Sequence, residues 1–106
     1  MSTSVTSRES DYEITVDGVH AGLAAFTTRP GVVVFTHMRI SDAFEGKGIG
    51  SQLAKAALDD VRRRGLSVVP RCPFIKAWIE QHPDYQDLVA LRTELPQGSD
   101  GGDRET

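Results

Sequence analysis

Three glycines alternate with other residues in the segment Glu-Gly-Lys-Gly-Ile-Gly, residues 45–50. Alternating glycines leave backbone N–H groups free of side-chain cover. A helix is expected to begin here, and the first N–H groups of a helix have no partner inside it, while the helix dipole adds partial positive charge. A phosphate placed there satisfies both features, and Lys47 adds a mobile positive charge. The segment therefore predicts a site for a phosphate-bearing cofactor.

Two better-known phosphate motifs do not fit this loop. The P-loop requires a glycine, four residues and then Gly-Lys-Ser/Thr, but Ser51 stands five positions after Gly46. The dinucleotide pattern G-x-G-x-x-G requires glycine where this chain has Ser51 or Leu53. A simpler alternative stays open, in which the glycines only allow tight turns.

Cys72 and His37 are the side chains best suited to acyl-transfer chemistry. Cys72 lies between an expected strand and an expected helix, where a thiol can accept an acetyl group transiently or give a proton to a departing thiolate. His37 precedes the glycine loop and can act as a general base. The alternatives are a small buried apolar cysteine and a structural strand histidine. One cysteine and three scattered histidines offer no zinc-binding spacing, so no metal is expected.

Charge and composition exclude several other classes of function. The net charge is −3, of which the tail carries −2, so no basic excess exists to bind nucleic acid. No apolar stretch approaches the roughly 20 residues that a membrane-spanning helix needs. A single cysteine fits a reducing compartment, and the N-terminal residues lack the pattern of a signal peptide. We expect a cytoplasmic protein that is a monomer or a weak dimer.

The strands that must position these residues follow from a period of two. Polar residues alternate with Tyr12, Ile14 and Val16, which predicts a half-buried strand. Turn sequences follow at Asp17-Gly18 and at Arg-Pro-Gly, residues 29–31. Further strands are therefore expected over about 20–28 and 32–40, and such short turns favour an antiparallel meander.

The period then changes to that of a helix over about residues 48–64. Apolar residues recur every four positions, at Ile49, Leu53, Ala57 and Val61. A short buried strand is expected over 66–70, parallel to the third strand through a right-handed crossover. A second helix is expected from Pro73, at its first turn, to about Gln81. The order is β-β-β-α-β-α, an α+β domain over residues 10–95. The polar residues 1–9 and the acidic tail 96–106 are expected to be disordered.

The loop, together with three other segments, resembles a known superfamily. Residues 45–53 look like the acetyl-CoA loop of the GNAT superfamily of N-acetyltransferases, usually written Arg/Gln-x-x-Gly-x-Gly/Ala, with Glu45 in the Arg/Gln position. A closer resemblance is to a short single-domain GNAT-like branch, through Thr36-His37, Val-Pro-Arg-Cys-Pro-Phe at 69–74 and His-Pro-Asp-Tyr at 82–85. That branch commonly has Glu where this chain has Arg39, so a carboxylate base is not carried over.

The resemblance implies a minimal acyl-CoA N-acyltransferase fold, with a mixed sheet that opens beside the cofactor. It implies that the chain binds acetyl-CoA and acetylates an amine that the sequence does not identify. The backbone of the strand before the loop would bind the pantetheine arm, and the loop would bind the pyrophosphate. Catalytic candidates are Cys72 and His37. The candidates for cofactor binding are Met38, Arg39, Ile40, Glu45, Gly46, Lys47, Gly48, Ile49, Gly50 and Ser51.

Three hypotheses for the function follow. The leading one is a small acetyltransferase that transfers acetyl from acetyl-CoA to an amine. The second is an acyl-CoA-binding module that is non-catalytic or only weakly active, because the sequence shows no clear base and no acceptor-binding helices. The third is an interaction domain whose glycines are only turns.

Overall fold

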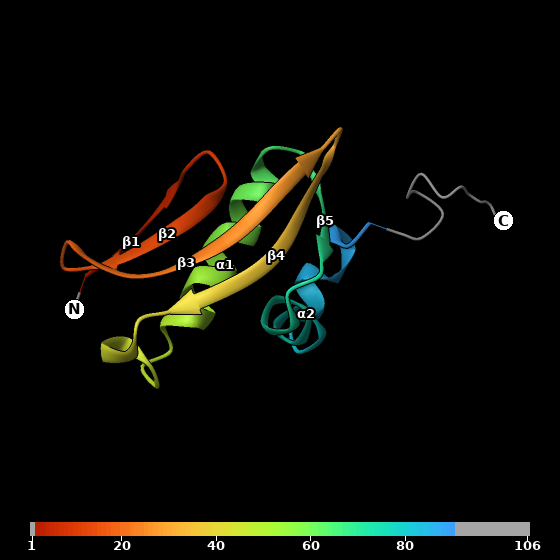
Figure 1. Ribbon diagram of the computed structural model, residues 1–106. Helices are drawn as coiled ribbons and strands as arrows, with labels where there is room; N and C mark the ends of the chain where they lie inside the picture. Colours follow the sequence, from red (N-terminus) through yellow and green to blue (C-terminus); the bar gives the residue numbers. More distant parts are fainter. Residues whose placement is uncertain (1, 91–106) are drawn as a thin grey trace, which may run out of the picture.

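The alternating segments form four consecutive antiparallel strands in the computed structural model, which describes residues 2–90 (Figure 1). They are β1 (Thr3–Ser7), β2 (Asp11–Val16), β3 (Val19–Arg29) and β4 (Val32–Ile40). Asp17 and Gly18 both have positive φ, 50° and 84°, which suits the tight β2–β3 turn. The predicted antiparallel meander is therefore confirmed.

The chain then crosses back through a helix to a parallel strand. The short 3₁₀ turn η1 (Asp42–Phe44) leads to α1 (Ile49–Arg63), and β5 (Ser67–Pro70) pairs with β4 in parallel. The sheet order is β1-β2-β3-β4-β5. The mixed sheet and the α+β class are as the sequence predicted.

The N-terminal segment differs from the prediction. Residues 1–9 were expected to be disordered, but Thr3–Ser7 is the edge strand β1. Its register against β2 runs from Thr3 opposite Val16 to Ser7 opposite Tyr12, and the Asp17 N–H donates to the Ser2 carbonyl at 2.7 Å. Backbone pairing holds this strand, because Val5 is its only apolar residue. The predicted order therefore lacks one strand, and the predicted tail 96–106 lies outside the described residues.

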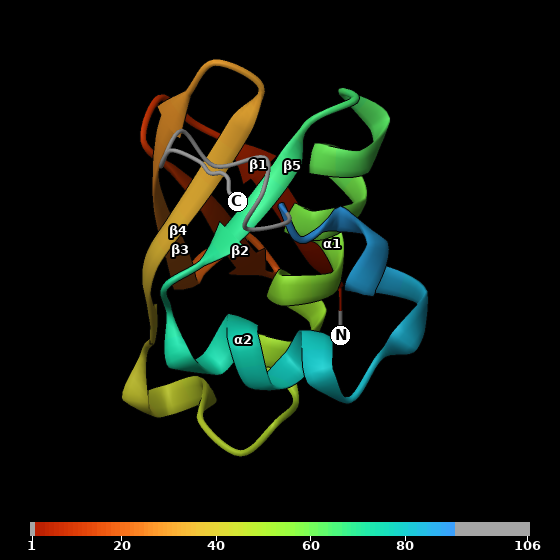
Figure 2. The same ribbon diagram turned by 90° about the vertical axis from the view of Figure 1, so that its right-hand side faces the viewer.

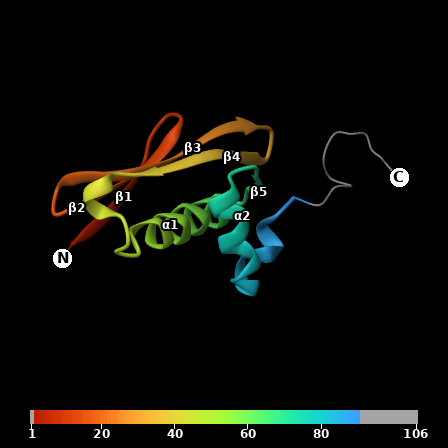
Figure 3. The ribbon, with the colours of Figure 1, turned by 60° about the horizontal axis from the view of Figure 1, so that its bottom comes forward.

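The helices cover one face of the sheet. Both α1 and the second helix α2 (Pro73–Glu80) lie on the same side of it (Figure 3). The core between the sheet and α1 is built from side chains such as Ile14, Phe35 and Leu53, each fully buried. None of the described helices covers the opposite face, which we call the open face.

The last described element fastens α2 and α1 together. It is the 3₁₀ segment η2 (Pro83–Leu88). The Tyr85 hydroxyl donates to the Asp59 carboxylate at 2.7 Å, and the Arg62 guanidinium donates to both oxygens of Asp87 at 3.0 and 2.9 Å. These contacts hold η2 against the C-terminal half of α1, and the Gln86 side-chain amide donates to the Ile79 carbonyl of α2 at 3.3 Å.

Candidate functional site

Two glycines just before α1 adopt the left-handed backbone conformation. Gly46 has φ 79°, and Gly48, the N-cap of α1, has φ 75°. L-residues with a Cβ rarely adopt such angles. A Cβ at either position would meet no atom within 4 Å, so the space beside the backbone is open. The loop therefore combines exposed N–H groups, a helix N-terminus and room for a ligand.

Gly50 has a different structural reason to be glycine. It lies inside the first turn of α1, and a Cβ built there would come within 2.9 Å of the Phe74 ring. The ring of Phe74, at the start of α2, is still 45% exposed. Sequence reasoning grouped Gly50 with the other two glycines, because spacing alone cannot distinguish a packing contact from a backbone cradle.

The Ser51 side chain connects the start of α1 to α2 through a hydrogen bond. The Trp78 indole N–H donates to the Ser51 hydroxyl at 2.8 Å, although Trp78 itself is buried. Figure 2 shows α2 lying across the N-terminal end of α1, next to the glycine loop. The sequence does not indicate this contact, since the four-residue spacing of Phe74 and Trp78 marks only a shared helix face.

The edge of β4 beside the loop is not paired over its whole length. Pairing with β5 ends at Phe35 and Pro70, while β4 continues to Ile40 (Figure 1). The chain leaves the sheet there, and the N–H groups of Arg71 and Cys72 both donate to the Phe35 carbonyl at 3.0 Å. Within the described residues, the β5 side of 36–40 is thus a strand edge without a strand partner.

A bulge reverses the faces of β4 at this point. Thr36 has no partner in the register: Phe26 pairs with Phe35, and Ala25 pairs with His37. As a result Met38 packs against the core, whereas His37 and Arg39 are exposed on the open face. Met38, Arg39 and Ile40 all belong to the segment of β4 that has no partner on its β5 side, and for these residues the family resemblance implied contacts with a pantetheine arm.

Cys72 and His37 lie on opposite sides of the sheet. Cys72 is only 2% exposed and packs in the core cluster on the α1 side, at the N-cap position of α2. His37 is on the open face. The two candidates are therefore not arranged as a nucleophile with its base, and each would have to act separately.

Glu45 and Lys47 are exposed in the loop. Neither makes a side-chain hydrogen bond or ion pair with another residue of the described part of the chain, so both charges face solvent beside the helix N-terminus. Lys47 adds positive charge there, while Glu45 opposes an anion. The backbone N–H groups and Lys47 are thus the favourable partners for a phosphate.

A second hollow lies at the other end of α1 and is separate from this site. It has a volume of about 490 Å³ and opens between the β1–β2 hairpin and the helix. Its polar groups pair with one another: the Tyr12 hydroxyl donates to Asp60 at 2.7 Å, and the Arg64 guanidinium lies 2.8 Å from the same carboxylate. Burial raises the pKa of Tyr12.

Residues 2–90 contain neither a cluster of metal ligands nor a membrane-spanning helix. No group of three or more His, Cys, Asp or Glu side chains in this range is placed to hold a metal ion. No helix in it is both long and apolar enough to cross a membrane.

Comparison with known sequences places most of the chain in one family. Residues 11–88 match the family of GCN5-related N-acetyl-transferases. The human protein NATD1 is 30% identical over 87 residues, which cover 80% of this chain and 77% of that protein. The mouse protein of the same name is 36% identical over 61 residues, 58% of this chain and 56% of its own length.

Solved structures agree with the fold. The solution structure of a GCN5-like protein from Staphylococcus aureus has a TM-score of 0.65 at 20% identity, covering 97% of this chain and 96% of the other. The ribosomal-protein-S18-alanine N-acetyltransferase from Escherichia coli has a TM-score of 0.53 at 16% identity and covers 57% of this chain. The match spans only 39% of that enzyme, so the likeness concerns a shared part of the fold.

Proposed function

The chain belongs to the GCN5-related N-acetyl-transferase family, and on that premise we propose that it transfers the acetyl group of acetyl-CoA to an amine. Enzymes of this family use acetyl-CoA as the acetyl donor. The observation that carries the proposal is the open cradle at Gly46 and Gly48, where left-handed glycines precede α1 and a Cβ would fill empty space.

The cofactor fits the residues present at this end of the molecule. A pyrophosphate at Gly46 and Gly48 would accept hydrogen bonds from the N–H groups of the first turn of α1, with Lys47 as a counter-charge. The free edge of β4, residues 38–40, offers backbone groups to the amide-bearing pantetheine arm in the way that a neighbouring strand would. The two segments lie on either side of the three-residue turn η1, which favours one extended molecule that contacts both.

When bound, the cofactor supplies a thioester whose carbonyl carbon is the electrophile. The amine nitrogen forms the new C–N bond, the C–S bond breaks, and one proton moves from nitrogen to the departing thiolate. His37, exposed on the open face, is the proposed base that accepts the amine proton from that side. The Cys72 thiol is the proposed proton donor or transient acetyl acceptor on the core side.

One observation favours a second candidate function, a module that binds acyl-CoA without useful turnover. Cys72 is buried and separated by the sheet from His37, so the described residues form no hydrogen-bonded pair of base and nucleophile. Both candidate functions use the same cofactor site, and they differ only in whether the acetyl group is transferred.

A stepwise experiment separates the hypotheses. Calorimetric titration with acetyl-CoA should show saturable binding, and a flat titration would reject both candidates together. A panel of amines is then incubated with acetyl-CoA and the protein while free coenzyme A thiol is followed. Amine-dependent thiol release above the protein-free rate supports the acetyltransferase. Binding without any release across the panel supports the non-catalytic module.

A further inference from the structure

The open face carries charges at the place where an acceptor would approach the thioester. The register aligns Glu13, Leu23 and Arg39 in one row across β2, β3 and β4, and Asp11, Ala25 and His37 in the next. Residues directly opposite in paired strands project from the same face. That face is the one that α1 does not cover, because the intervening residue Ala24 is fully buried on the helix side.

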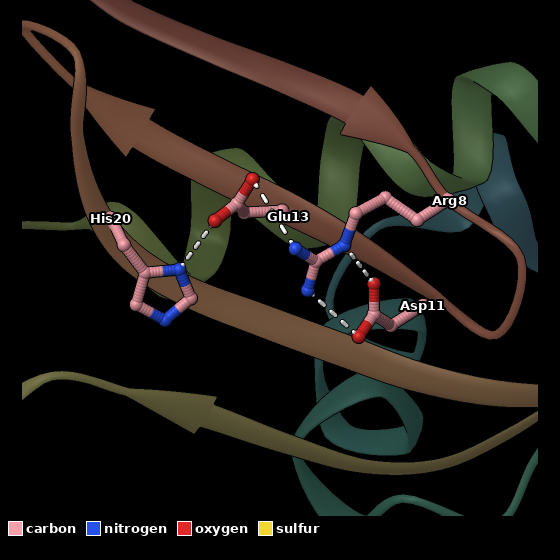
Figure 4. A network of polar contacts seen from close by, with 4 residues as sticks. All are labelled: Arg8, Asp11, Glu13 and His20. Atoms are coloured by element: carbon pink, nitrogen blue, oxygen red, sulfur yellow. Dashed lines mark hydrogen bonds and ion pairs between the residues drawn. The ribbon is translucent and has the colours of Figure 1, made fainter.

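The two carboxylates on β2 already have partners. The Arg8 Nε donates to the Asp11 carboxylate at 2.6 Å, and its second nitrogen donates to the other oxygen at 2.9 Å. Arg8 also lies 3.5 Å from Glu13, and the His20 ring nitrogen is 2.6 Å from the same carboxylate (Figure 4). The hydrogen bond from Arg8 lowers the pKa of Asp11, which is the shift expected of a paired carboxylate.

Arg39 is the unpaired cation of this face that lies near His37, whereas Arg29 lies at the other end of the face. Its side chain is exposed and makes no hydrogen bond or ion pair with any other residue between 2 and 90. Glu13 is two strands away, which is about 10 Å at the usual strand spacing and close to the distance at which salt screens an exposed pair. The half-buried side chains of Leu23 and Ala25 form an apolar surface between the charged residues of β2 and Arg39 on β4.

Arg39 also lies beside the proposed reaction centre. It belongs to the segment of β4 that continues past the end of pairing with β5, two residues after His37 on the same face. An amine that approaches from the open face therefore meets a planar guanidinium with free donors. Such a group binds carboxylates in a fork-like geometry and repels ammonium groups.

We propose that the acceptor is an amine that also carries a carboxylate on a short aliphatic chain, with Arg39 binding the carboxylate. The inference rests on the proposed function for the identity of the reaction. Beyond that function, it specifies the charge of the acceptor substrate and identifies Arg39 as a residue that determines specificity. The amine would reach His37 while the aliphatic chain lies over Ala25 and Leu23.

Three amines of nearly equal length test the charge class. 4-Aminobutyrate, butylamine and 1,4-diaminobutane end in an anionic, a neutral and a cationic group. Each is titrated into ¹⁵N-labelled protein with and without coenzyme A, and the Arg39 Nε–H signal is followed. We expect 4-aminobutyrate to bind about three- to tenfold more tightly than butylamine, the range of an exposed charge-assisted pair, and 1,4-diaminobutane to bind least.

Matched variants assign the preference to Arg39. Arg39→Gln should erase it, and Arg39→Glu should invert it in favour of 1,4-diaminobutane. Arg29→Gln is the control, because Arg29 is an exposed arginine at the opposite end of the same face, paired with Val32. It should keep the wild-type preference. Equal affinity for the three amines, or the same loss in Arg29→Gln, would overturn the inference.

If the proposed function itself is wrong, the experiments give a different set of results. In that case neither coenzyme A nor acetyl-CoA would bind, and no amine would release thiol. The titrations without coenzyme A would still show whether Arg39 selects a carboxylate. Where the protein does turn over, the ratio of kcat/KM for 4-aminobutyrate and butylamine should fall in Arg39→Gln by the same factor as the binding preference.

Discussion

The ring of Phe74 lies against Gly50, so close that a Cβ at position 50 would come within 2.9 Å of it. This contact joins the first turn of α2 to the first turn of α1. Helix N-termini from two distant parts of the sequence thus meet beside the glycine loop. The contact is structural in origin, yet it sets how closely α2 approaches the proposed cofactor site.

The Phe74–Gly50 contact predicts a coupling free energy between the two positions in a double-mutant cycle. Gly50→Ala should change the free energy of unfolding by less than about 0.5 kcal/mol, because the half-exposed Phe74 ring must swing aside and this cost offsets the gain in helix propensity. In a Phe74→Ala background the same change should stabilise the protein by about 0.5–1 kcal/mol, since only the propensity gain remains. Urea unfolding of the four proteins measures both values. The same effect of Gly50→Ala in both backgrounds would contradict the contact.

The hydrogen bond from Trp78 to Ser51 should contribute measurably to stability. Ser51→Ala removes the acceptor of a buried indole N–H, and we expect a loss of about 0.5–1.5 kcal/mol together with a shifted indole N–H signal. Ser41→Ala is the control, since Ser41 makes no capping hydrogen bond at η1. It should change stability by less than about 0.5 kcal/mol. Equal effects of both variants would show that the bond is not formed in solution.

Cys72 should matter for turnover and not for cofactor binding. We expect Cys72→Ala to lower kcat by about 100-fold or more, the usual contribution of a positioned proton donor, while acetyl-CoA affinity stays within twofold. The variant loses a buried side chain, so a loss of stability could mimic this result. Val16→Ala, which removes a buried side chain elsewhere in the core, controls for that and should retain kcat. Unchanged kcat in Cys72→Ala would leave the thiol a purely structural role.

The Arg8–Asp11 pair predicts a pH dependence of stability. The hydrogen bond from Arg8 lowers the pKa of Asp11 in the folded protein from its ordinary value of 3.8. The folded state then binds this proton less readily than the unfolded state, so the contribution to stability is complete above 3.8 and disappears as the pH falls through the lower, folded pKa. The difference in unfolding free energy between wild type and Asp11→Asn should therefore be larger at pH 6 than at pH 2. A difference that is the same at both pH values would show that the pair adds nothing.

Much of the fold could be predicted because its signals are local. The alternation of Tyr12, Ile14 and Val16 and the four-residue recurrence in α1 each report burial along a single element. The edge strand β1 could not be recognised, because Thr3–Ser7 contains one apolar residue and depends on pairing with β2. Local composition favoured disorder there, and backbone hydrogen bonding overrode it.

The candidate site was predictable only in part, for a related reason. The spacing of its glycines makes the loop recognisable in the sequence, but no sequence pattern indicates the bulge at Thr36. Regular alternation from the buried Phe35 would turn His37 and Arg39 toward the core, whereas the extra residue turns both to the open face. The roles of Gly50 and Ser51 depend in the same way on contacts with α2, which no spacing within α1 reveals.

A side chain at position 48 tests the cofactor site most directly. Asparagine tolerates positive φ, so Gly48→Asn keeps the backbone while filling the space where the pyrophosphate is proposed to lie. Gly18→Asn, at a turn residue with φ 84° and open space around it, is the matched control. In calorimetric titrations with acetyl-CoA, wild type and Gly18→Asn should bind alike, and Gly48→Asn should bind at least about tenfold more weakly, equivalent to about 1.4 kcal/mol. Equal affinity of all three proteins, or no binding by the wild type, would contradict the proposed site.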